Sequence, residues 1–382
     1  MDKLRENQIG MQVLEVGNRE AWTAVLNASV RHDFHHLPQY HQVSEQRGEG
    51  KAALFVYRED DYFVALPLLL RAVDAKNPDG WQDATSVYGY AGPVISHETM
   101  PVRVVDNFQR ALASAFEERR VVAVFSRLHP LIEQRHLLIG LGECRENGHT
   151  ISIDLQPAPE EQATRYSRSC RDSLKKLRKQ GFVGVHDPEK RYLPEFISIY
   201  HETMRRVTAA SSYFFDEAYF TLLTQELGAV SQLFVVLAAG QVAAATLCTI
   251  CNGIVQDHLG GTRGEFLKHS PDRLVVDTER LWAKAAGASV FHLGGGVGAQ
   301  QDSVFRYKSG FSDRRHSFRT WRWIINAEVY EELCAERARA NEAQGLRASA
   351  AGYFPAYRSP AVPAQAEAPA ESIAGKEGCA DA

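Results

Sequence analysis

One lysine near the C-terminal end of the sequence is placed as a catalytic cation would be. Lys308 lies in the run 305–311, between aromatic residues and shortly after the glycine-rich stretch 294–298. Aromatic neighbours restrict the lysine stem, and glycines let a substrate approach the backbone closely. A cation held in this way can stabilise the negative charge that develops on a carbonyl oxygen under nucleophilic attack. The alternative is a lysine that only extends its stem across apolar side chains.

Other polar residues complete a candidate catalytic centre. Histidine and aspartate commonly move protons in enzymes, so His258 and Asp302 are predicted to take part in catalysis, with Asp257 as a further candidate. The glycine stretch lacks the spacing of a dinucleotide-binding motif. It is either a flexible turn or a backbone cradle for a polar or anionic group. Substrate binding is therefore assigned to Gly294, Gly295 and Arg306.

A cluster of positive charge occupies residues 165–179. This run holds seven basic side chains and one acidic one, although the whole chain carries a net charge of -4. At helical spacing, four of the cations share one face, namely Arg165, Arg168, Lys175 and Lys179. The face is either simply solvated, or it contacts the phosphates of a tRNA or of a nucleotide-linked substrate.

Two further motifs have a plain structural interpretation. Cys248 and Cys251 form a CxxC pattern inside an apolar strand, without the second pair that a zinc ribbon requires, so they are predicted to be core residues. The histidines at 32, 35, 36 and 41 cluster near one aspartate. A polar loop with a helix cap is favoured there over a metal site, and no metal or bound cofactor is predicted.

Composition limits the classes of function. The chain has 382 residues, of which 45% are hydrophobic and 24% charged, which allows two or three globular domains. An acidic net charge argues against a general nucleic-acid coat, and no DNA partner is expected. Six sparse cysteines and a polar N-terminus favour the cytoplasm. The apolar run 233–250 is interrupted by Gly240 and predicts two strands, so no transmembrane segment is expected.

The elements that must position these residues follow from periodicity and turn residues. A hairpin is predicted from the strands 52–57 and 62–73. Further strands are expected at 85–95, 121–126, 150–155, 233–237, 241–251, 254–259, 289–293 and 316–325. Helices are expected at 104–118, 160–180, 193–207, 216–227, 271–286 and 328–346, with Ser270 as the N-cap before Pro271.

The same order of strands and helices appears twice, which predicts two domains. Strand, helices, antiparallel meander, helix and strand follow one another in residues 150–330, and a weaker version occupies residues 1–149. Residues 331–352 are assigned to a terminal helix. The Ala/Pro/Glu-rich residues 353–382 are predicted to be a disordered tail, since they have little apolar surface to bury.

Several segments in a fixed order carry a resemblance to a known family. They are residues 33–40, 88–93, 152–155, 180–182, 201–206 and 268–311. With these segments the sequence resembles the FemAB/FemX superfamily of GNAT-like peptidyl and acyl transferases, and within it the GNAT acetyltransferase subgroup. The resemblance covers residues 12–325 and implies an α/β (α+β) fold of two tandem GNAT-like domains with a cleft between them.

The resemblance also implies roles for particular residues. Lys308 matches the lysine that stabilises the transition state in FemX-like members, and Arg205 or Arg206 is the nearest match to the phosphate-binding groups. Tyr88 and Tyr90 belong to a matching segment and are assigned to substrate binding. Donor binding is assigned to Arg168, Lys175, Arg263 and Ser270. The stretch 262–270 has a single glycine, which departs from the pyrophosphate loop of acetyl-CoA enzymes.

The expected function is therefore N-acyl transfer. Family members move an aminoacyl group from tRNA, or an acyl group from a thioester such as acyl-CoA, to an amine of a cell-envelope precursor. The acceptor would be a peptidoglycan precursor or an amino-sugar. Two alternatives remain: a small-molecule N-acetyltransferase that uses acetyl-CoA, and a non-catalytic binding scaffold with the same fold.

Overall fold

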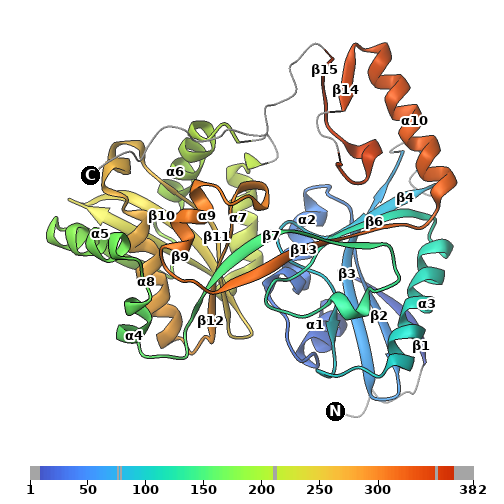
Figure 1. The fold of residues 1–382 in the computed structure, drawn as a ribbon, viewed down its shortest axis with the longest axis horizontal. Coiled ribbons are helices and arrows are strands. Elements are labelled where there is room, and N and C mark those ends of the chain that lie inside the picture. Colours follow the sequence, from blue (N-terminus) through green and yellow to red (C-terminus); the bar gives the residue numbers. More distant parts are fainter. Residues whose placement is uncertain (1–8, 75–76, 78–79, 210–212, 349–351, 365–382) are drawn as a thin grey trace. The chain divides into compact units, whose positions relative to one another are not determined.

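A computed structural model describes residues 9–74, 77, 80–209, 213–348 and 352–364 (Figure 1). Contacts divide the chain into two compact units. Unit 1 takes in Met1–Arg31, Ser44–Glu146 and Arg319–Ala382, and unit 2 takes in His32–Val43 and Asn147–Phe318. The predicted boundaries at 149 and 330 assumed that each domain is one continuous stretch of the chain. They differ from these units because a short N-terminal segment packs in unit 2 and the C-terminal residues return to unit 1.

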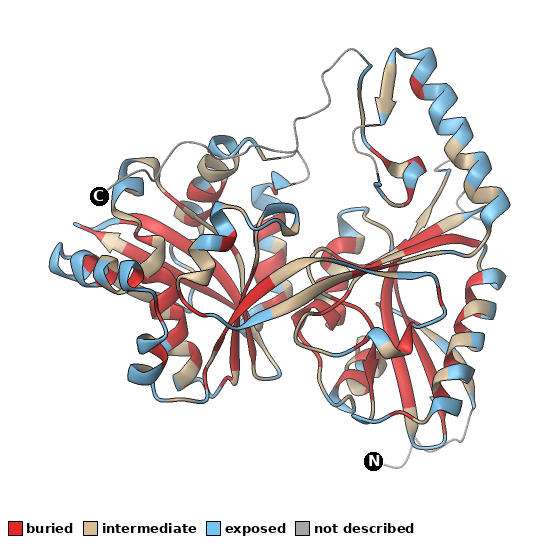
Figure 2. Ribbon diagram, viewed as in Figure 1, coloured by how far each residue is buried: buried red, intermediate tan, exposed pale blue. Residues whose placement is uncertain are grey.

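Unit 1 is built on a mixed sheet in the order β1–β2–β3–β4–β6–β13, with β5 beside β3. All these pairs are antiparallel except β4–β6. Helix α3 (Val102–Glu118) buries apolar residues at helical spacing against β1, β2 and β6 (Figure 2). The strands are β1 (Gly10–Glu15), β2 (Lys51–Glu59), β3 (Tyr62–Ala72), β4 (Gln82–Thr85), β5 (Val94–Ile95), β6 (Val121–Arg127) and β13 (Arg315–Ile324), and the other helices are α1 (Arg19–Asn27) and α10 (Ala327–Ala343).

Unit 2 is built on the sheet order β7–β12–β11–β10–β9–β8. Helices α5 and α8 cover one face of this sheet, and α6 packs against β10 and β11. The strands are β7 (Glu143–Asp154), β8 (Val183–Asp187), β9 (Ser231–Ala238), β10 (Gln241–Cys251), β11 (Ile254–Thr262) and β12 (Val290–Gly295). The helices are α2 (Pro38–Gln46, shared with unit 1), α4 (Pro159–Thr164), α5 (Arg168–Lys179), α6 (Leu193–Arg206), α7 (Glu217–Leu227), α8 (Asp272–Ala285) and α9 (Ser303–Ser309).

Most predicted elements occur within a few residues of their expected bounds. The apolar run 233–250 forms parts of the strands β9 and β10, as expected, and none of the described helices is long and apolar enough to cross a bilayer. The helix predicted over 160–180 divides into α4 and α5. It breaks at Ser167, whose hydroxyl accepts a hydrogen bond from the Cys170 amide and caps α5. Helix α8 begins at Asp272, with Pro271 in place of Ser270 as N-cap.

The C-terminal segment differs from the predicted disordered tail over residues 353–364. Strand β14 (Leu346–Ala348) pairs with β15 (Ala361–Pro363), and the short 3-10 helix η7 (Ala356–Arg358) lies between them in sequence. Tyr357 is buried, and the Arg358 guanidinium donates to Asp83 at 2.7 Å and to the Ala72 carbonyl at 2.6 Å. Residues 365–382 lie outside the described part of the chain.

Replacing Arg358 is therefore expected to destabilise unit 1. Asp83 is fully buried and is paired with Arg71 and Arg358, so Arg358→Met removes one of the two guanidinium partners of a buried carboxylate. A hydrogen bond to a charged group contributes about 1.5–3 kcal/mol, which corresponds to a Tm loss of about 3–12 °C. Calorimetry of Arg358→Met against the exposed control Arg339→Met measures this loss. Equal Tm values for the two variants would mean that the segment contributes no stability.

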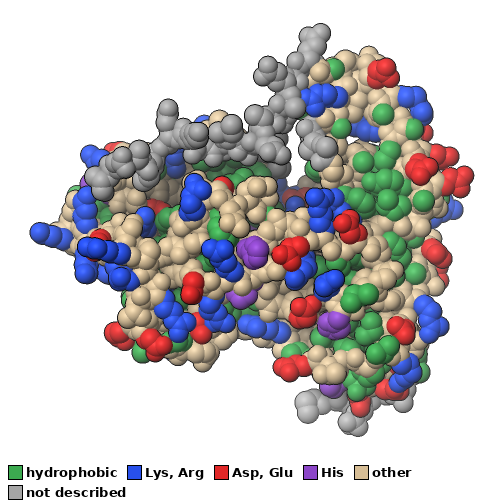
Figure 3. Space-filling view, in the orientation of Figure 1, with side chains coloured by type: hydrophobic (Ala, Val, Ile, Leu, Met, Phe, Trp, Pro, Cys, Tyr) green, Lys and Arg blue, Asp and Glu red, His purple; other side chains and the backbone are tan. Residues whose placement is uncertain are grey.

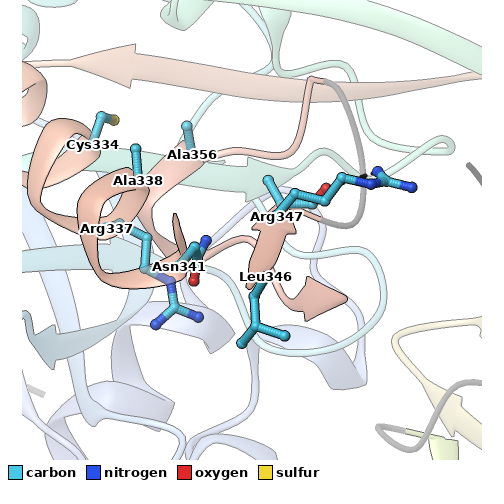
Figure 4. A pocket seen from close by; sticks show the side chains of 8 residues that line it. Cys334, Arg337, Ala338, Asn341, Leu346, Arg347 and Ala356 are labelled. Atoms are coloured by element: carbon cyan, nitrogen blue, oxygen red, sulfur yellow. Dashed lines mark hydrogen bonds between the residues drawn. The ribbon is translucent and has the colours of Figure 1, made fainter. Parts of the chain in front are cut away.

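Docking of this segment also forms a cavity of about 320 Å³ in unit 1 (Figure 4). It is lined by residues of α10, β14 and η7, and its wall includes the free thiol of Cys334. Burial raises the pKa of this thiol, which makes it a poor nucleophile at neutral pH.

Candidate active site

Two neighbouring strands of unit 2 separate partway along their length. The parallel pair β11–β12 is in register only from Ile254 and Val290 to Gln256 and His292. Both strands continue, to Thr262 and Gly295, but along these fully described stretches they no longer pair with each other. Unpaired backbone groups of both strands are therefore available where the strands separate, as a polar substrate requires.

A β-bulge lies at the separation point of each strand. Between β10 and β11 the register skips His258, since Leu247 pairs with Leu259 and Cys248 with Asp257. Between β12 and β7 the register skips Leu293. Such bulges bend a strand and re-aim its side chains, and they are frequent beside active sites.

The side chain of Lys308, a residue of α9, reaches the end of β12. Its ammonium donates a hydrogen bond of 3.0 Å to the carbonyl of Gly295, the last residue of that strand. Gly295 is required there, because a Cβ atom at this position would come within 2.9 Å of the His149 carbonyl oxygen. Helix α9 carries the lysine and is fixed by the buried Phe305 and by an Asp302 cap. Lys308 is thus held by its helix and by one backbone carbonyl.

Asp257 on β11 is the carboxylate that interacts with this lysine. Burial lowers the pKa of Lys308, while the charges of Asp257 and Asp302 oppose that change. Burial raises the pKa of Asp257, the charge of Lys308 opposes this, and Asp272 adds to it. A carboxylate with raised proton affinity beside a cation provides a proton acceptor and a charge stabiliser at one place.

A further acid, Asp272, lies at the N-terminus of α8 and interacts with Asp257. Burial raises the pKa of the Asp272 carboxyl, which is opposed by contacts with Tyr307 and with its own backbone amide and that of Arg273. Free amides at a helix N-terminus are a common anion site. Here the first amides of α8 point at a carboxylate of the protein itself, so they are less available to a donor phosphate.

Comparison with known proteins shows which fold these elements form. Residues 164–309, which include β11, α8, β12 and Lys308, match the model described as an acetyltransferase (GNAT) domain. No curated protein matches the chain. Among solved structures, FemX superposes with a TM-score of 0.64 at 13% identity, covering 84% of this chain and 99% of its own. The chain has a FemAB-like GNAT fold.

Two further solved structures share this GNAT fold. L-PGS from Bacillus licheniformis has a TM-score of 0.50 at 14% identity, with 84% of this chain and 94% of that chain covered. The C-terminal domain of a protein described as a lysylphosphatidylglycerol synthetase from Agrobacterium fabrum has a TM-score of 0.50 at 12% identity, with 82% and 92% covered. At these identities the likeness is one of fold, and it agrees with the predicted α/β class.

The two other predicted catalytic residues have different surroundings in the GNAT domain. Asp302 accepts hydrogen bonds from the amides of Val297 and Phe305, so its carboxylate caps α9 and fixes the glycine stretch. His258 lies among the rings of Phe34, His35 and Tyr40, at centroid distances of 5.1, 6.4 and 6.0 Å. Burial lowers the pKa of His258 to about 3, so its ring is neutral at physiological pH.

The predicted substrate and donor residues of unit 2 fall into two groups. Gly294, with a φ of +78°, and Gly295 form the end of β12, and Arg306 is exposed on α9. Arg205 and Arg206 are exposed at the end of α6, where Arg206 donates to the Thr262 carbonyl at 3.1 Å. The second group, Arg206, Arg263 and Ser270, lies on or beside the loop that joins β11 to α8. Arg263 also donates to the Val242 carbonyl at 3.0 Å.

Part of the basic face predicted on 165–179 lies on the surface of α5, whereas Arg165 ends α4, before the break at Ser167, and is not part of that helix. Arg168, Lys175 and Lys179 are exposed on the side opposite the buried Leu174 and Leu177 (Figure 3). Helix α5 lies beside the loop that joins β11 to α8, because Gln180 contacts His269 at 3.2 Å and Arg273 donates to Ser173 at 2.9 Å. The exposed cations of α5 are therefore on a helix that packs beside the N-terminus of α8.

The remaining sequence motifs have the following places. Tyr88 and Tyr90 are half-buried in the loop after β4 of unit 1, and the Tyr90 ring lies 6.3 Å from that of His129. Asp33 and His36 form a capping box at Phe34–His36, so the histidine cluster includes the predicted helix cap. Cys248 is buried on β10, as expected for a core cysteine.

Sequence analysis missed one residue close to this site. Glu279 on α8 is fully buried, although its side chain is charged in water. It follows Val275 and Val276 by four and three residues, so it occupies the apolar face of an otherwise regular helix. A charged residue at a core position of a periodic helix was the signal that could have identified it.

Proposed function

We propose that the protein is an N-acyltransferase whose reaction takes place where β11 and β12 separate. The observation that carries this proposal is Lys308, held by the Gly295 carbonyl at the end of β12 and interacting with Asp257 of β11. The match of residues 164–309 to an acetyltransferase domain supports the same reaction class.

The proposed reaction assigns one task to each group. An amine of the acceptor attacks the carbonyl carbon of an ester or thioester, and the new C–N bond forms as the bond to the donor oxygen or sulfur breaks. Asp257 takes one proton from the acceptor ammonium, and the departing oxygen or sulfur takes the second. Lys308 stabilises the carbonyl oxygen while it carries negative charge.

Two observations favour an aminoacyl-tRNA as the donor. The first amides of α8 face the Asp272 carboxylate, which leaves less room for the pyrophosphate of a CoA donor. Exposed cations of α5 adjoin the same loop and match the charge of an RNA backbone. An acyl-CoA donor is the second candidate, supported by the match to the acetyltransferase domain.

The proposed acceptor is an amine of a cell-envelope precursor, either a peptidoglycan precursor or a polysaccharide amino-sugar, modified in the cytoplasm. Support comes from the shared fold with FemX and with a protein described as a lysylphosphatidylglycerol synthetase. Incubating the purified protein separately with acetyl-CoA and with charged tRNA, and measuring saturable binding, tests the donor. Mass spectrometry of acceptor amines then tests transfer. Binding of neither donor would contradict the proposal.

Reversing the charge of the basic face is expected to abolish tRNA binding. Each phosphate contact releases counterions, so binding to Arg168, Lys175 and Lys179 should weaken steeply with salt. The triple change of these residues to glutamate should reduce the affinity at least about 100-fold in low salt. The control carries three changes elsewhere, namely Arg120→Glu, Arg337→Glu and Arg339→Glu. Unchanged tRNA binding by the α5 variant would show a merely solvated face and would favour the acyl-CoA donor.

A further inference from the structure

Glu279 is an unusual buried group. Its side chain has no exposed surface, and neither carboxyl oxygen has a hydrogen-bond partner among the described residues. Buried polar groups are normally paired, and an unpaired buried carboxylate is especially unfavourable. The group therefore requires an explanation in terms of its protonation state.

The surroundings of Glu279 are acidic. Asp272 lies seven residues earlier on the same face of α8, and Asp257 of β11 interacts with both acids. From β10, the thiol of Cys248 faces the same place, because Cys248 pairs with Asp257 across the strands. Lys308 interacts with Asp257, and no cation among the described residues forms an ion pair with Glu279.

The other charged groups packed on α8 have partners of their own. Arg280 of α8 and Arg178 of α5 both form ion pairs with Asp277. His186 of β8 lies against the Trp282 ring, 5.1 Å away, and bonds to Gln232 at 2.6 Å. Burial first, and then the charge of Asp257, raise the pKa of Glu279 well above its ordinary value. These surroundings favour a neutral carboxylic acid.

We propose that Glu279 is a positioning residue which stays protonated in the working enzyme, and that its ionisation sets the upper pH limit of acyl transfer. The second part rests on the proposed function. A neutral Glu279 leaves Asp257 as the negative charge opposite Lys308. Ionisation at high pH adds a second negative charge behind Asp257. That charge opposes the developing oxyanion and draws Lys308 away from it.

The first experiment tests protonation without any assay of activity. Infrared difference spectra at pH 7 should show a protonated carboxylic acid in the parent protein that is missing in Glu279→Gln. Since the raised pKa belongs to the folded state, stability is highest below the unfolded pKa and is lost as pH rises. Above about pH 5, the folding constant of the parent should fall relative to that of Glu279→Gln, by up to tenfold per pH unit. Absence of both differences overturns the proposal.

The second experiment tests the link to the reaction. The alkaline limb of kcat/KM should move at least about one pH unit higher in Glu279→Gln, while the exposed control Glu332→Gln on α10 keeps the parent profile. A protonated Glu279 with an unchanged pH profile would overturn its role in the site. Absence of any acyl transfer, with the infrared band present, would reject the proposed function and leave the protonation of Glu279 established. If Glu279→Gln fails to fold, the infrared titration of the parent protein, from which the band must disappear at alkaline pH, decides the question.

Discussion

Lys308→Met is expected to reduce turnover at least about 100-fold while the protein remains folded. Methionine keeps the bulk of the stem and removes the charge, which is needed chiefly when the carbonyl oxygen becomes negative. Loss of one oxyanion-stabilising group costs about 3–4 kcal/mol of activation free energy. Acceptor binding should change much less than the rate, because the interaction is made in the transition state.

The chain offers a matched control for this change. Lys284 also donates to a backbone carbonyl, that of Gln156 at 3.0 Å, but it lies at the far end of α8. Lys284→Met should therefore lose the same kind of hydrogen bond without loss of turnover. Single-turnover kinetics and thermal unfolding of both variants separate chemistry from folding. Turnover of Lys308→Met within threefold of the parent would remove this lysine from the mechanism.

Asp257→Asn is expected to have the second large effect, a rate loss of about 100-fold or more. A positioned general base contributes about 100- to 10,000-fold, and asparagine accepts no proton from an ammonium. In the parent, activity should rise with pH as Asp257 ionises, and burial places this rise above the usual range of an aspartate. The rise should be missing in the variant.

The pH profile of kcat/KM for the parent, Asp257→Asn and the exposed control Asp313→Asn measures this effect. The control should keep both the rate and the acidic limb. An acidic limb that persists in Asp257→Asn would assign the base to another group, and Asp272 would be the next to test.

Sequence patterns predicted the elements around the site better than the site itself. Strands and helices such as 241–251 and 271–286 follow local periodicity, so their existence could be read from neighbouring residues. The resemblance led to Lys308, but Asp257 stood only as a further candidate. Its proximity to Lys308 and Asp272 depends on how β11 and β12 separate, which no local pattern encodes.

The C-terminal residues show the same limit in another way. Composition favoured disorder from residue 353, since the stretch is rich in Ala, Pro and Glu and most of its apolar side chains are small. What holds the segment is a long-range ion pair, Arg358 with Asp83, together with the burial of Tyr357. A single arginine in a Pro-rich stretch carries no sign of a partner 275 residues away.

The passage of residues 32–43 into unit 2 has a consequence for synthesis on the ribosome. Phe34 and His35 pack against His258, and both sides of that contact belong to unit 2. At about 5–20 residues per second, the ribosome makes His258 about 10–50 seconds after Phe34. Phe34 and His35 therefore spend that interval without the His258 ring as a neighbour. A gene fragment for residues 147–318 alone would lack this segment.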